Sequence, residues 1–303
     1  TEIDDVEIQK VSYWYVNQTW AANYSVGRVF CGGDAVHRHP PSSGLGSNTC
    51  MQDAFNLAWK LAYAVKGWAQ PSLLASYTAE RAPVGKQIVA RANQSRFDYK
   101  HLKDVFGFDQ GVTTQAQMLD RIFAETEDAA KIREQLFKAL EIKHYEFNAQ
   151  GTELNQRYAS NAVVAESDEE VFLQDPQLHL QATTRPGAKV PHAWLVDAKG
   201  QKRSTLDISG KGRFTLMTGL SGAGWKAAAE ALALPYLDVV QIGSRQFRDV
   251  YGAWNAKSEV HEAGAVLVRP DGYVAWRMVD KPNEGYGYAA VLKQVLAQIQ
   301  LNV

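Results

Sequence analysis

The stretch that most constrains the fold joins a short apolar segment, a loop of prolines and glycines, and a long helical pattern. Residues 28–31 (Arg-Val-Phe-Cys) indicate a buried strand that runs directly into Gly-Gly-Asp. Pro, Ser and Gly fill the loop at 38–48. Apolar side chains then recur at helical spacing over 54–65, and residues 49–52 match a capping box that would start this helix. A strand, a loop and a helix in this order are typical of α/β proteins.

This junction has the chemistry of a site for a flat, anionic ligand. Asp34 follows the predicted strand at the edge where α/β sheets bind ligands, and its carboxylate can accept hydrogen bonds from sugar or ribityl hydroxyls. Gly44 and Gly46 let backbone N–H groups approach a ligand at a helix N-terminus, which favours an anion. Reduced flavin is such an anion, so the residues favour a flavin. The alternative is a junction that merely packs well, but packing alone does not require these residue types in this order.

Taken whole, residues 27–61 resemble the second FAD-binding motif of the para-hydroxybenzoate hydroxylase class of flavoprotein monooxygenases. The agreement is ordered: Gly-Asp-Ala-x-His begins at Gly33, Pro-x-x-Gly-x-Gly-x-Asn at Pro41, and Asp-Ala-x-Asn-Leu at Asp53. The resemblance implies that Asp34 contacts the ribityl chain of FAD and that Pro41 lies beside the reactive flavin carbon. The backbone of residues 44–48 would hold the pyrimidine edge. The implied cofactor-binding residues are Gly33, Asp34, Pro41, Gly44, Leu45, Gly46, Ser47 and Asn48.

Within this class the chain is most similar to bacterial phenol and chlorophenol hydroxylases, especially those of dichlorophenol. The resemblance implies FAD, NADPH or NADH, and O2 as reactants. It also implies that a flavin C4a-hydroperoxide hydroxylates a phenol, in this subgroup a chlorophenol, ortho to its hydroxyl group. Hydroxylation of polyketide or phenylpropionate-type rings is an open alternative. No catalytic acid or base can be assigned in this chain.

The C-terminal part alternates between short apolar runs and helical patterns. Strands are expected at 213–218, 237–242, 264–269 and 273–277, and helices at 224–233, 246–254 and 287–299. Pro270-Asp271-Gly272 predicts the turn between the last two strands. This order resembles the thioredoxin fold. The predicted fold class is therefore α/β: the C-terminal part of a para-hydroxybenzoate hydroxylase-type FAD-binding domain with a helical extension (1–147), a connection (148–188) and a thioredoxin-like α/β domain (189–303).

Two further helical regions separate the flavin motif from the connection. A helix is expected after Pro71, bent near Pro83, with Glu80 and Arg81 forming an ion pair that fixes two helices. Residues 112–147 predict more helices whose apolar side chains face inward, namely Met118, Leu119, Ile122, Phe123, Ile132, Leu136, Phe137 and Leu140. Whether residues 151–160 lie back across the flavin domain is left open by the sequence.

The resemblance covers only the C-terminal portion of the class. The Gly-x-Gly-x-x-Gly turn that cradles the FAD pyrophosphate in complete members does not occur in this sequence. We therefore expect a fragment that binds FAD poorly by itself. Residues 1–20, which include a predicted strand at 11–20, would lead out of the substrate domain. Tyr13, Trp14, Tyr15 and Trp20, together with Pro41, would then line the ring pocket, although a place for these aromatic side chains in the core or on the surface of a sheet is equally open.

Composition sets limits on partners and compartment. Lys and Arg total 32 against 33 Asp and Glu, so no overall field favours nucleic acid or a charged membrane. No apolar run reaches the length of a membrane span, and the two cysteines suit a reducing cytoplasm. His37 and His39 lack further ligands nearby, so no metal site is predicted. The resemblance implies a homo-oligomer, a dimer or tetramer; alternatively the isolated fragment is a non-catalytic dimerisation module.

Overall fold

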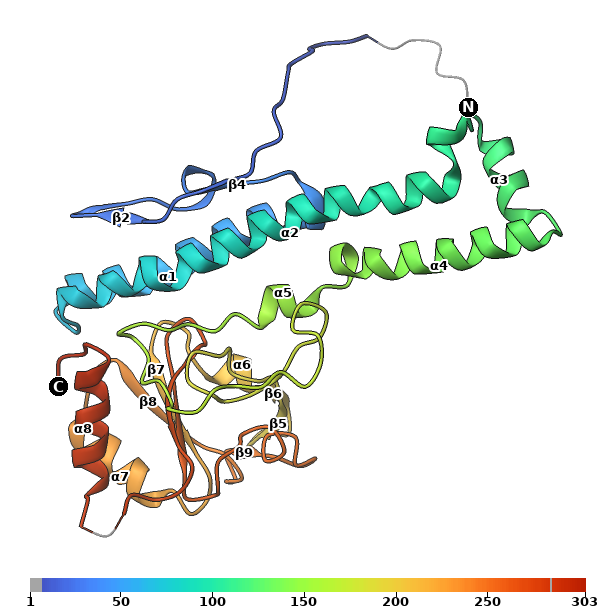
Figure 1. The fold of residues 1–303 in the computed structure, drawn as a ribbon. Helices are drawn as coiled ribbons and strands as arrows, with labels where there is room; N and C mark the ends of the chain where they lie inside the picture. The colour runs from blue at the N-terminus through green and yellow to red at the C-terminus, as the bar shows by residue number, and fades with distance from the viewer. Residues whose placement is uncertain (1–6, 284) are drawn as a thin grey trace.

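The computed structural model describes residues 7–283 and 285–303. Its N-terminal part is built on helix α1 (Leu45–Val65), a 3-10 turn η3 (Pro71–Ala75) and the long helix α2 (Ser76–Phe106), which turns back along α1 (Figure 1). Helices α3 (Gln115–Phe123), α4 (Glu127–Phe147) and α5 (Gln150–Leu154) follow. None of the helices in the described residues is both long and apolar enough to cross a membrane.

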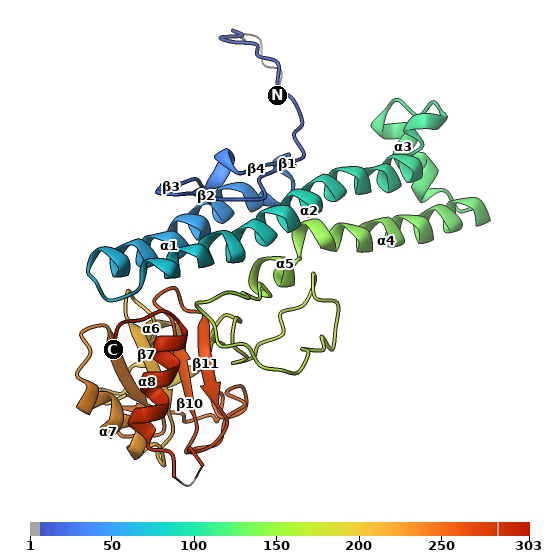
Figure 2. The same ribbon diagram turned by 60° about the vertical axis from the view of Figure 1, so that its left-hand side comes forward.

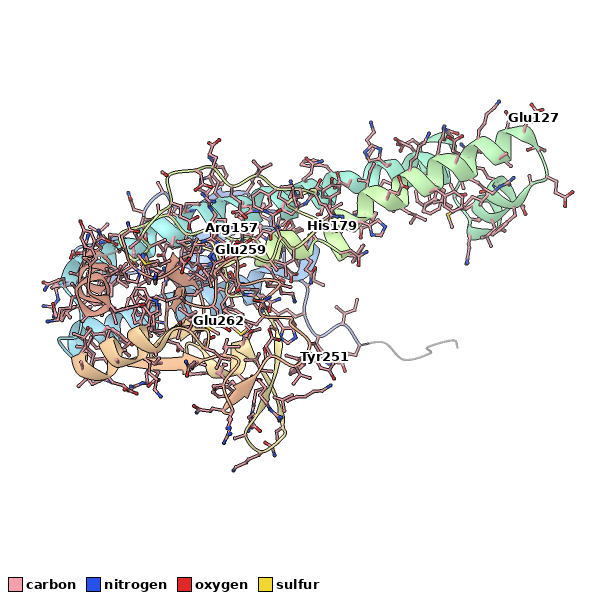
Figure 3. The ribbon with its side chains drawn as sticks, turned by 90° about the horizontal axis from the view of Figure 1, so that it is seen from below. Glu127, Arg157, His179, Tyr251, Glu259 and Glu262 are labelled. Carbon is pink, nitrogen blue, oxygen red and sulfur yellow. The ribbon has the colours of Figure 1, made fainter. Side chains whose placement is uncertain are left out.

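Helix α4 packs beside the second half of α2, and together with α3 they form an arm that extends beyond the body (Figure 1, Figure 2). Figure 3 shows Glu127 at the far end of this arm, away from Arg157 and Glu259 in the body. The predicted helices over 112–147 are thus confirmed.

The predicted orientation of the apolar side chains on the arm is largely wrong. Ile122 is buried, Met118, Ile132 and Leu136 are half-buried, and the rest are exposed: Leu119, Phe123, Phe137 and Leu140. The buried side chains of α4 are instead Ala129, Ala139 and Lys143, and Lys143 Nζ donates to the Ser95 carbonyl of α2. An apolar stripe therefore remains uncovered within the described residues.

The start of α1 differs from the prediction. The expected capping box at 49–52 is wrong, because the helix already begins at Leu45 and Thr49 is buried inside it. Two consecutive residues in left-handed conformation, Ser43 (φ 66°) and Gly44 (φ 61°), turn the chain just before the helix. Helix α2 is continuous through Pro83.

The N-terminal strands are short. Strand β1 (Thr19–Trp20) pairs antiparallel with β4 (His37–Arg38), and β2 (Ser25–Val26) with β3 (Val29–Phe30). Residues 11–18 form no strand, so the prediction for 11–20 holds only at its end. The strand predicted at 28–31 exists as β3, but Val29 is exposed, because within the described residues β3 pairs with β2 alone.

The C-terminal part confirms most of its predicted order. Its main sheet has the order β11-β10-β7-β8, with β7 parallel to β8 and antiparallel to β10, and β10 antiparallel to β11. In Figure 1, the two long helices of this part lie on one side of this sheet and a second sheet, β6-β5-β9, lies on the other. The bounds are β5 Trp194–Asp197, β6 Lys202–Ser204, α6 Thr205–Ile208, β7 Phe214–Thr218, α7 Ala223–Leu232, β8 Leu237–Gln241, β9 Phe247–Arg248, β10 Ala265–Val268, β11 Val274–Met278 and α8 Tyr288–Gln298.

The helix predicted at 246–254 is wrong, and strands β5 and β6 were not predicted. Residues 247 and 248 form strand β9, and the chain then turns at Gly252 (φ 63°). The Asp249 carboxylate accepts the backbone N–H of Asn255, a local bond that competes with a helix. The predicted turn at 270–272 is confirmed, with Gly272 at φ 80° and its N–H donating to the Arg269 carbonyl.

One hydrophobic core joins α1 to the C-terminal sheet. Trp59 and Tyr63 of α1 pack edge-on against Phe214 of β7. The same cluster continues to Trp225 of α7 and Leu292 of α8. Helix α1 is therefore held by the C-terminal part along its second half, while its first turns remain beside the loop that precedes it.

Candidate flavin-binding site

Three of the eight residues predicted to bind a cofactor, Asp34, Pro41 and Gly46, line one hollow of about 380 Å³. Asp34 reaches it from the turn after β3, Pro41 from the loop and Gly46 from the first turn of α1. These residues are brought together although the loop separates them in sequence. Four residues that the sequence did not single out as cofactor ligands complete the lining: Trp14, Asn17, Arg38 and His39.

The first turn of α1 offers backbone rather than side chains to this hollow. The Leu45 side chain is buried in a cluster with Val84 and Ile88, so only its backbone is available. A Cβ on Gly44 would meet no atom within 4 Å, which means that glycine leaves open space there. The first N–H groups of a helix lack intrahelical partners and carry partial positive charge. This end of α1 can therefore receive an anionic edge of a ligand.

The loop before the helix is fixed by a few local contacts. The Asn48 side-chain amide donates to the Gly44 carbonyl over 2.9 Å, and the Ser43 hydroxyl lies 3.1 Å from the Ser95 hydroxyl of α2. These bonds hold Ser43 in a left-handed conformation that costs free energy for a residue with a side chain. The strained residue, Ser43, lies between Pro41 and Gly46, which both line the hollow. Such strain is expected in a loop that must present its backbone to a ligand.

Asp34 sits in a single 3-10 turn, η1 (Gly33–Ala35), and its carboxylate is exposed. Gly33 has φ 61°, a conformation that favours glycine. Arg38 donates through Nε to the Asp34 carbonyl over 2.9 Å, so the arginine lies next to the carboxylate-bearing residue. The turn thus presents one free carboxylate and one guanidinium at the same hollow.

A buried carboxylate lies directly behind this turn. Asp53 of α1 is 1% exposed and accepts three hydrogen bonds, from Gly33 N (3.0 Å), His37 Nε2 (3.0 Å) and Arg81 Nε (2.6 Å). Burial alone raises the pKa of the Asp53 carboxyl, but the hydrogen bond from His37 and the charge of Arg81 outweigh it and hold this pKa below its usual range. Asp53 is therefore an ionised anchor for the turn.

A second buried cluster lies further along the same helices. Glu80 accepts hydrogen bonds from Lys60 Nζ (2.7 Å) and from both terminal nitrogens of Arg269 (2.6 and 2.9 Å), and Arg269 also bonds Asp271. Burial raises the pKa of Glu80, but the charges of Arg269 and Lys60 outweigh it and hold this pKa far below its usual range. The predicted Glu80–Arg81 pair is thus wrong: Glu80 pairs with Lys60 and Arg269, and Arg81 pairs with Asp53.

Residues 151–160 do lie back across the helices. Arg81 Nη1 donates to Gln156 Oε1 (3.0 Å) and to the Tyr158 hydroxyl (2.9 Å), and the Ser160 hydroxyl donates to Glu80 over 2.6 Å. Sequence reasoning missed this polar core. Its signal was the set of polar residues on one face of α1, at 53, 56 and 60, inside an otherwise apolar helical pattern.

The remaining candidate residues lie elsewhere. Tyr13 and Tyr15 are 95% and 79% exposed and do not line the hollow, so their role in a ring pocket stays a prediction. Both cysteines are free thiols. His37 Nε2 is hydrogen-bonded to the Asp53 carboxylate, and His39 Nδ1 lies 2.7 Å from the Pro40 carbonyl. Within the described residues there is no group of three or more His, Cys, Asp or Glu side chains that could hold a metal ion.

Comparison with known proteins bears on two parts of the chain. Residues 1–92 match the FAD binding domain family, and residues 183–299 match the family of the C-terminal domain of aromatic-ring hydroxylases. The chain is 47% identical over 282 residues to phenol 2-monooxygenase of Pseudomonas sp. (strain EST1001). The matched region covers 90% of this chain and 46% of that protein. It is 42% identical over 302 residues to 2,4-dichlorophenol 6-monooxygenase of Cupriavidus pinatubonensis, and this match covers 97% of this chain and 50% of that protein.

A solved structure agrees with these matches. The flavin-dependent monooxygenase PieE, in complex with FAD and substrate, superimposes with a TM-score of 0.88 at 45% identity, covering 98% of this chain and 51% of that one. The chain thus spans about half the length of the relatives that it matches. In its two matched domains, its relatives and its fold, the chain is similar to about half of a flavin-dependent aromatic-ring monooxygenase.

Proposed function

We propose that this chain, as part of a complete flavoprotein with a dinucleotide-binding half, binds FAD and hydroxylates a phenol ortho to its hydroxyl group. NADPH or NADH and O2 are the proposed co-substrates. The observation that carries the proposal is that Asp34, Pro41 and the first turn of α1 border a single hollow. A carboxylate and a helix N-terminus on one cavity suit a ligand that has hydroxyl groups at one end and an anionic edge at the other.

In this proposal the residues of the chain bind and orient the cofactor. The exposed Asp34 carboxylate would accept a hydrogen bond from a ribityl hydroxyl, while the backbone of residues 44–48 would hold the pyrimidine edge. The chemistry that FAD supplies when bound is two-electron reduction by the nicotinamide and transfer of one oxygen atom of O2 to the ring, with the other leaving as water. Helix α1, fixed at its far end by the core, keeps its N–H groups directed at developing negative charge.

The substrate class is proposed from the relatives. Phenol and dichlorophenol monooxygenases reach 42–47% identity, whereas a tetracenomycin A2 monooxygenase-dioxygenase and a polyketide hydroxylase reach 33% and 32%. A single phenolic ring, chlorinated or not, is therefore favoured over a fused polyketide. Pro41 borders the hollow and can contact such a ring, and Tyr13 and Tyr15 are proposed to join it.

We propose a cytoplasmic homo-oligomer, a dimer or a tetramer, as the working form. Two free thiols are compatible with a reducing compartment. Phe123 and Phe137 are 71% and 66% exposed on the arm, and contact with a second copy would remove this apolar surface from water.

The test is a substrate panel with the complete flavoprotein. Phenol, 2,4-dichlorophenol, 3-(3-hydroxyphenyl)propionate and a polyketide naphthol are each supplied with NADPH or NADH, and catechol formation is measured against nicotinamide and O2 consumption. The proposal predicts coupled catechol formation with the simple phenols. Nicotinamide oxidation that yields only hydrogen peroxide with those phenols, but product with the polyketide, would overturn the substrate assignment.

A further inference from the structure

The carboxylate behind the flavin turn is held from the other side by the C-terminal part. Arg81 is fully buried, and its guanidinium bonds both α1 and the connection: Nε donates to Asp53, and Nη1 donates to Gln156 and Tyr158. Asp53 in turn accepts the N–H of Gly33, the residue immediately before Asp34. One planar group therefore links the connection between the two parts of the chain to the backbone of the turn.

The link continues into the C-terminal sheet. The Tyr158 ring stacks on the Tyr273 ring with centroids 4.1 Å apart, and the Tyr273 hydroxyl donates to Gln156 Oε1 over 3.1 Å. Tyr273 immediately precedes β11, and the Arg269 N–H donates to its carbonyl across the hairpin. Hydrogen bonds and stacking thus run without a break from the β10–β11 hairpin to Gly33.

The second buried cluster provides an internal comparison. Lys60, Glu80 and Arg269 also join α1, α2 and the same hairpin, and all three are fully or almost fully buried. None of their hydrogen bonds in the described residues reaches the Gly33–Ala35 turn or a residue that lines the hollow. The two clusters share burial and position in the fold but differ in contact with the turn.

We propose that Asp53 and Arg81 are positioning residues through which the C-terminal part sets the conformation of the Gly33–Asp34 turn, and thereby the affinity for FAD. The inference rests on the proposed function in one respect, that the ligand of this turn is FAD. Neither residue touches the hollow, so each acts through the backbone that carries Asp34. The C-terminal part then contributes to cofactor retention without contacting the cofactor.

Three variants test this link at different points. Asp53→Asn keeps the shape of the anchor but removes its charge, Tyr273→Phe removes only the hydroxyl that bonds Gln156, and Arg81→Lys keeps the charge but loses the planar group that bonds both α1 and the connection. Lys60→Met is the matched control, because it removes a buried cation from the second cluster. Tyr273→Phe is the mildest change, so it keeps the test informative if Asp53→Asn does not fold.

Two readouts separate the inference from the proposed function. In the chain of residues 1–303, NMR on a 15N-glycine-labelled sample measures hydrogen exchange of the Gly33 amide relative to global unfolding. In the complete flavoprotein, fluorescence titration measures the FAD dissociation constant. We expect Asp53→Asn and Arg81→Lys each to raise that constant about tenfold, as one lost charge-assisted bond implies, and Tyr273→Phe about twofold to threefold. Gly33 exchange should accelerate in the same order.

The control decides the interpretation. Lys60→Met should lower the denaturation midpoint while Gly33 exchange, relative to unfolding, and the FAD dissociation constant stay unchanged. The inference would be overturned if Lys60→Met and Asp53→Asn, at equal losses of stability, lost FAD affinity equally. It would also be overturned if Asp53→Asn or Arg81→Lys accelerated Gly33 exchange without changing the FAD dissociation constant. Failure of the proposed function is distinguishable, because the unmodified flavoprotein would then bind no FAD at all.

Discussion

Replacing Glu80 by Gln gives the sharpest test of how the two parts of the chain are held together. Glu80 is 2% exposed and neutralises two buried cations, Lys60 and Arg269. Its carboxylate also accepts bonds from Asn56 and Ser160. The glutamine side chain keeps one oxygen that can accept a hydrogen bond. Its NH2 group, however, would face Lys60 or Arg269, which are themselves donors. Lys60 then lacks any carboxylate partner, while Arg269 keeps only Asp271.

The magnitude follows from the burial of these charges. Removing one partner of a buried ion pair costs about 3–5 kcal/mol, because the other charge remains desolvated without compensation. At about 1.4 kcal/mol per tenfold change, this shifts the ratio of folded to unfolded protein by a factor of roughly a hundred or more. Arg269 and Lys60 would then be the main sources of the loss.

Urea denaturation followed by tryptophan fluorescence measures this loss close to its origin, because the Trp59 ring lies 5.2 Å from the Arg269 guanidinium carbon. Glu134→Gln is the matched control: the same substitution is made in an ion pair with Lys138 whose side chains are 67% and 68% exposed. Its midpoint should equal that of the unmodified protein. The reasoning is refuted if Glu80→Gln and Glu134→Gln have the same midpoint.

Two further predictions concern the flavin turn. Gly33→Ala should lower the free energy of unfolding by about 1–3 kcal/mol, because an L residue is strained at φ 61° and the new Cβ would lie 2.9 Å from Cys50 Sγ. Gly27→Ala is the control in the same denaturation assay: with φ 58° and open space around its Cβ, it should show the backbone strain alone. Equal losses in the two variants would rule out a contribution from the contact with Cys50. Asp53 has a pKa held below that of the unfolded chain, so its stabilising contribution is present above about pH 4 and is lost as the pH falls through the folded value. The difference in midpoint between the unmodified protein and Asp53→Asn should therefore narrow below about pH 4 in a pH series, and a difference that is constant from pH 7 to pH 3 would contradict this.

Much of the fold followed from local patterns. Helices α1, α2 and α8 and strands β7, β8, β10 and β11 lie where periodicity and turn residues predicted them. All of these elements except α2 contribute buried side chains to the two apolar clusters around the C-terminal sheet. The helix predicted at 246–254 failed for a local reason: Asp249 bonds a nearby backbone N–H and Gly252 turns the chain. Side-chain composition alone did not reveal that competition.

Patterns also did not determine what covers a surface. The side chains of Phe123 and Phe137 follow helical spacing, yet they are exposed. Periodicity predicts which face of a helix is apolar, but it does not predict which element, if any, packs against that face. The start of α1 was misplaced since Ser43 adopts a left-handed conformation that residue preference disfavours. Both errors concern features that tertiary contacts decide.

The candidate site was predictable where it depends on a contiguous motif. Asp34, Pro41 and Gly46 were identified from the sequence, and they line one hollow. Arg38 was not predicted as part of it, although it follows His37 in the same segment. The pairing of Asp53 with Arg81 was missed because it depends on how α2 packs against α1, which no local pattern fixes.

The central claim is that the Asp34 carboxylate and the start of α1 hold opposite parts of one FAD molecule. Titration of FAD into the complete flavoprotein and its Asp34→Ala variant, with Asp120→Ala on the arm as control, measures it most directly. We expect Asp34→Ala to raise the FAD dissociation constant by about tenfold to a hundredfold, the range for one lost hydrogen bond to a charged group, while Asp120→Ala leaves it unchanged. An Asp34→Ala variant that binds FAD as tightly as the unmodified protein would contradict it.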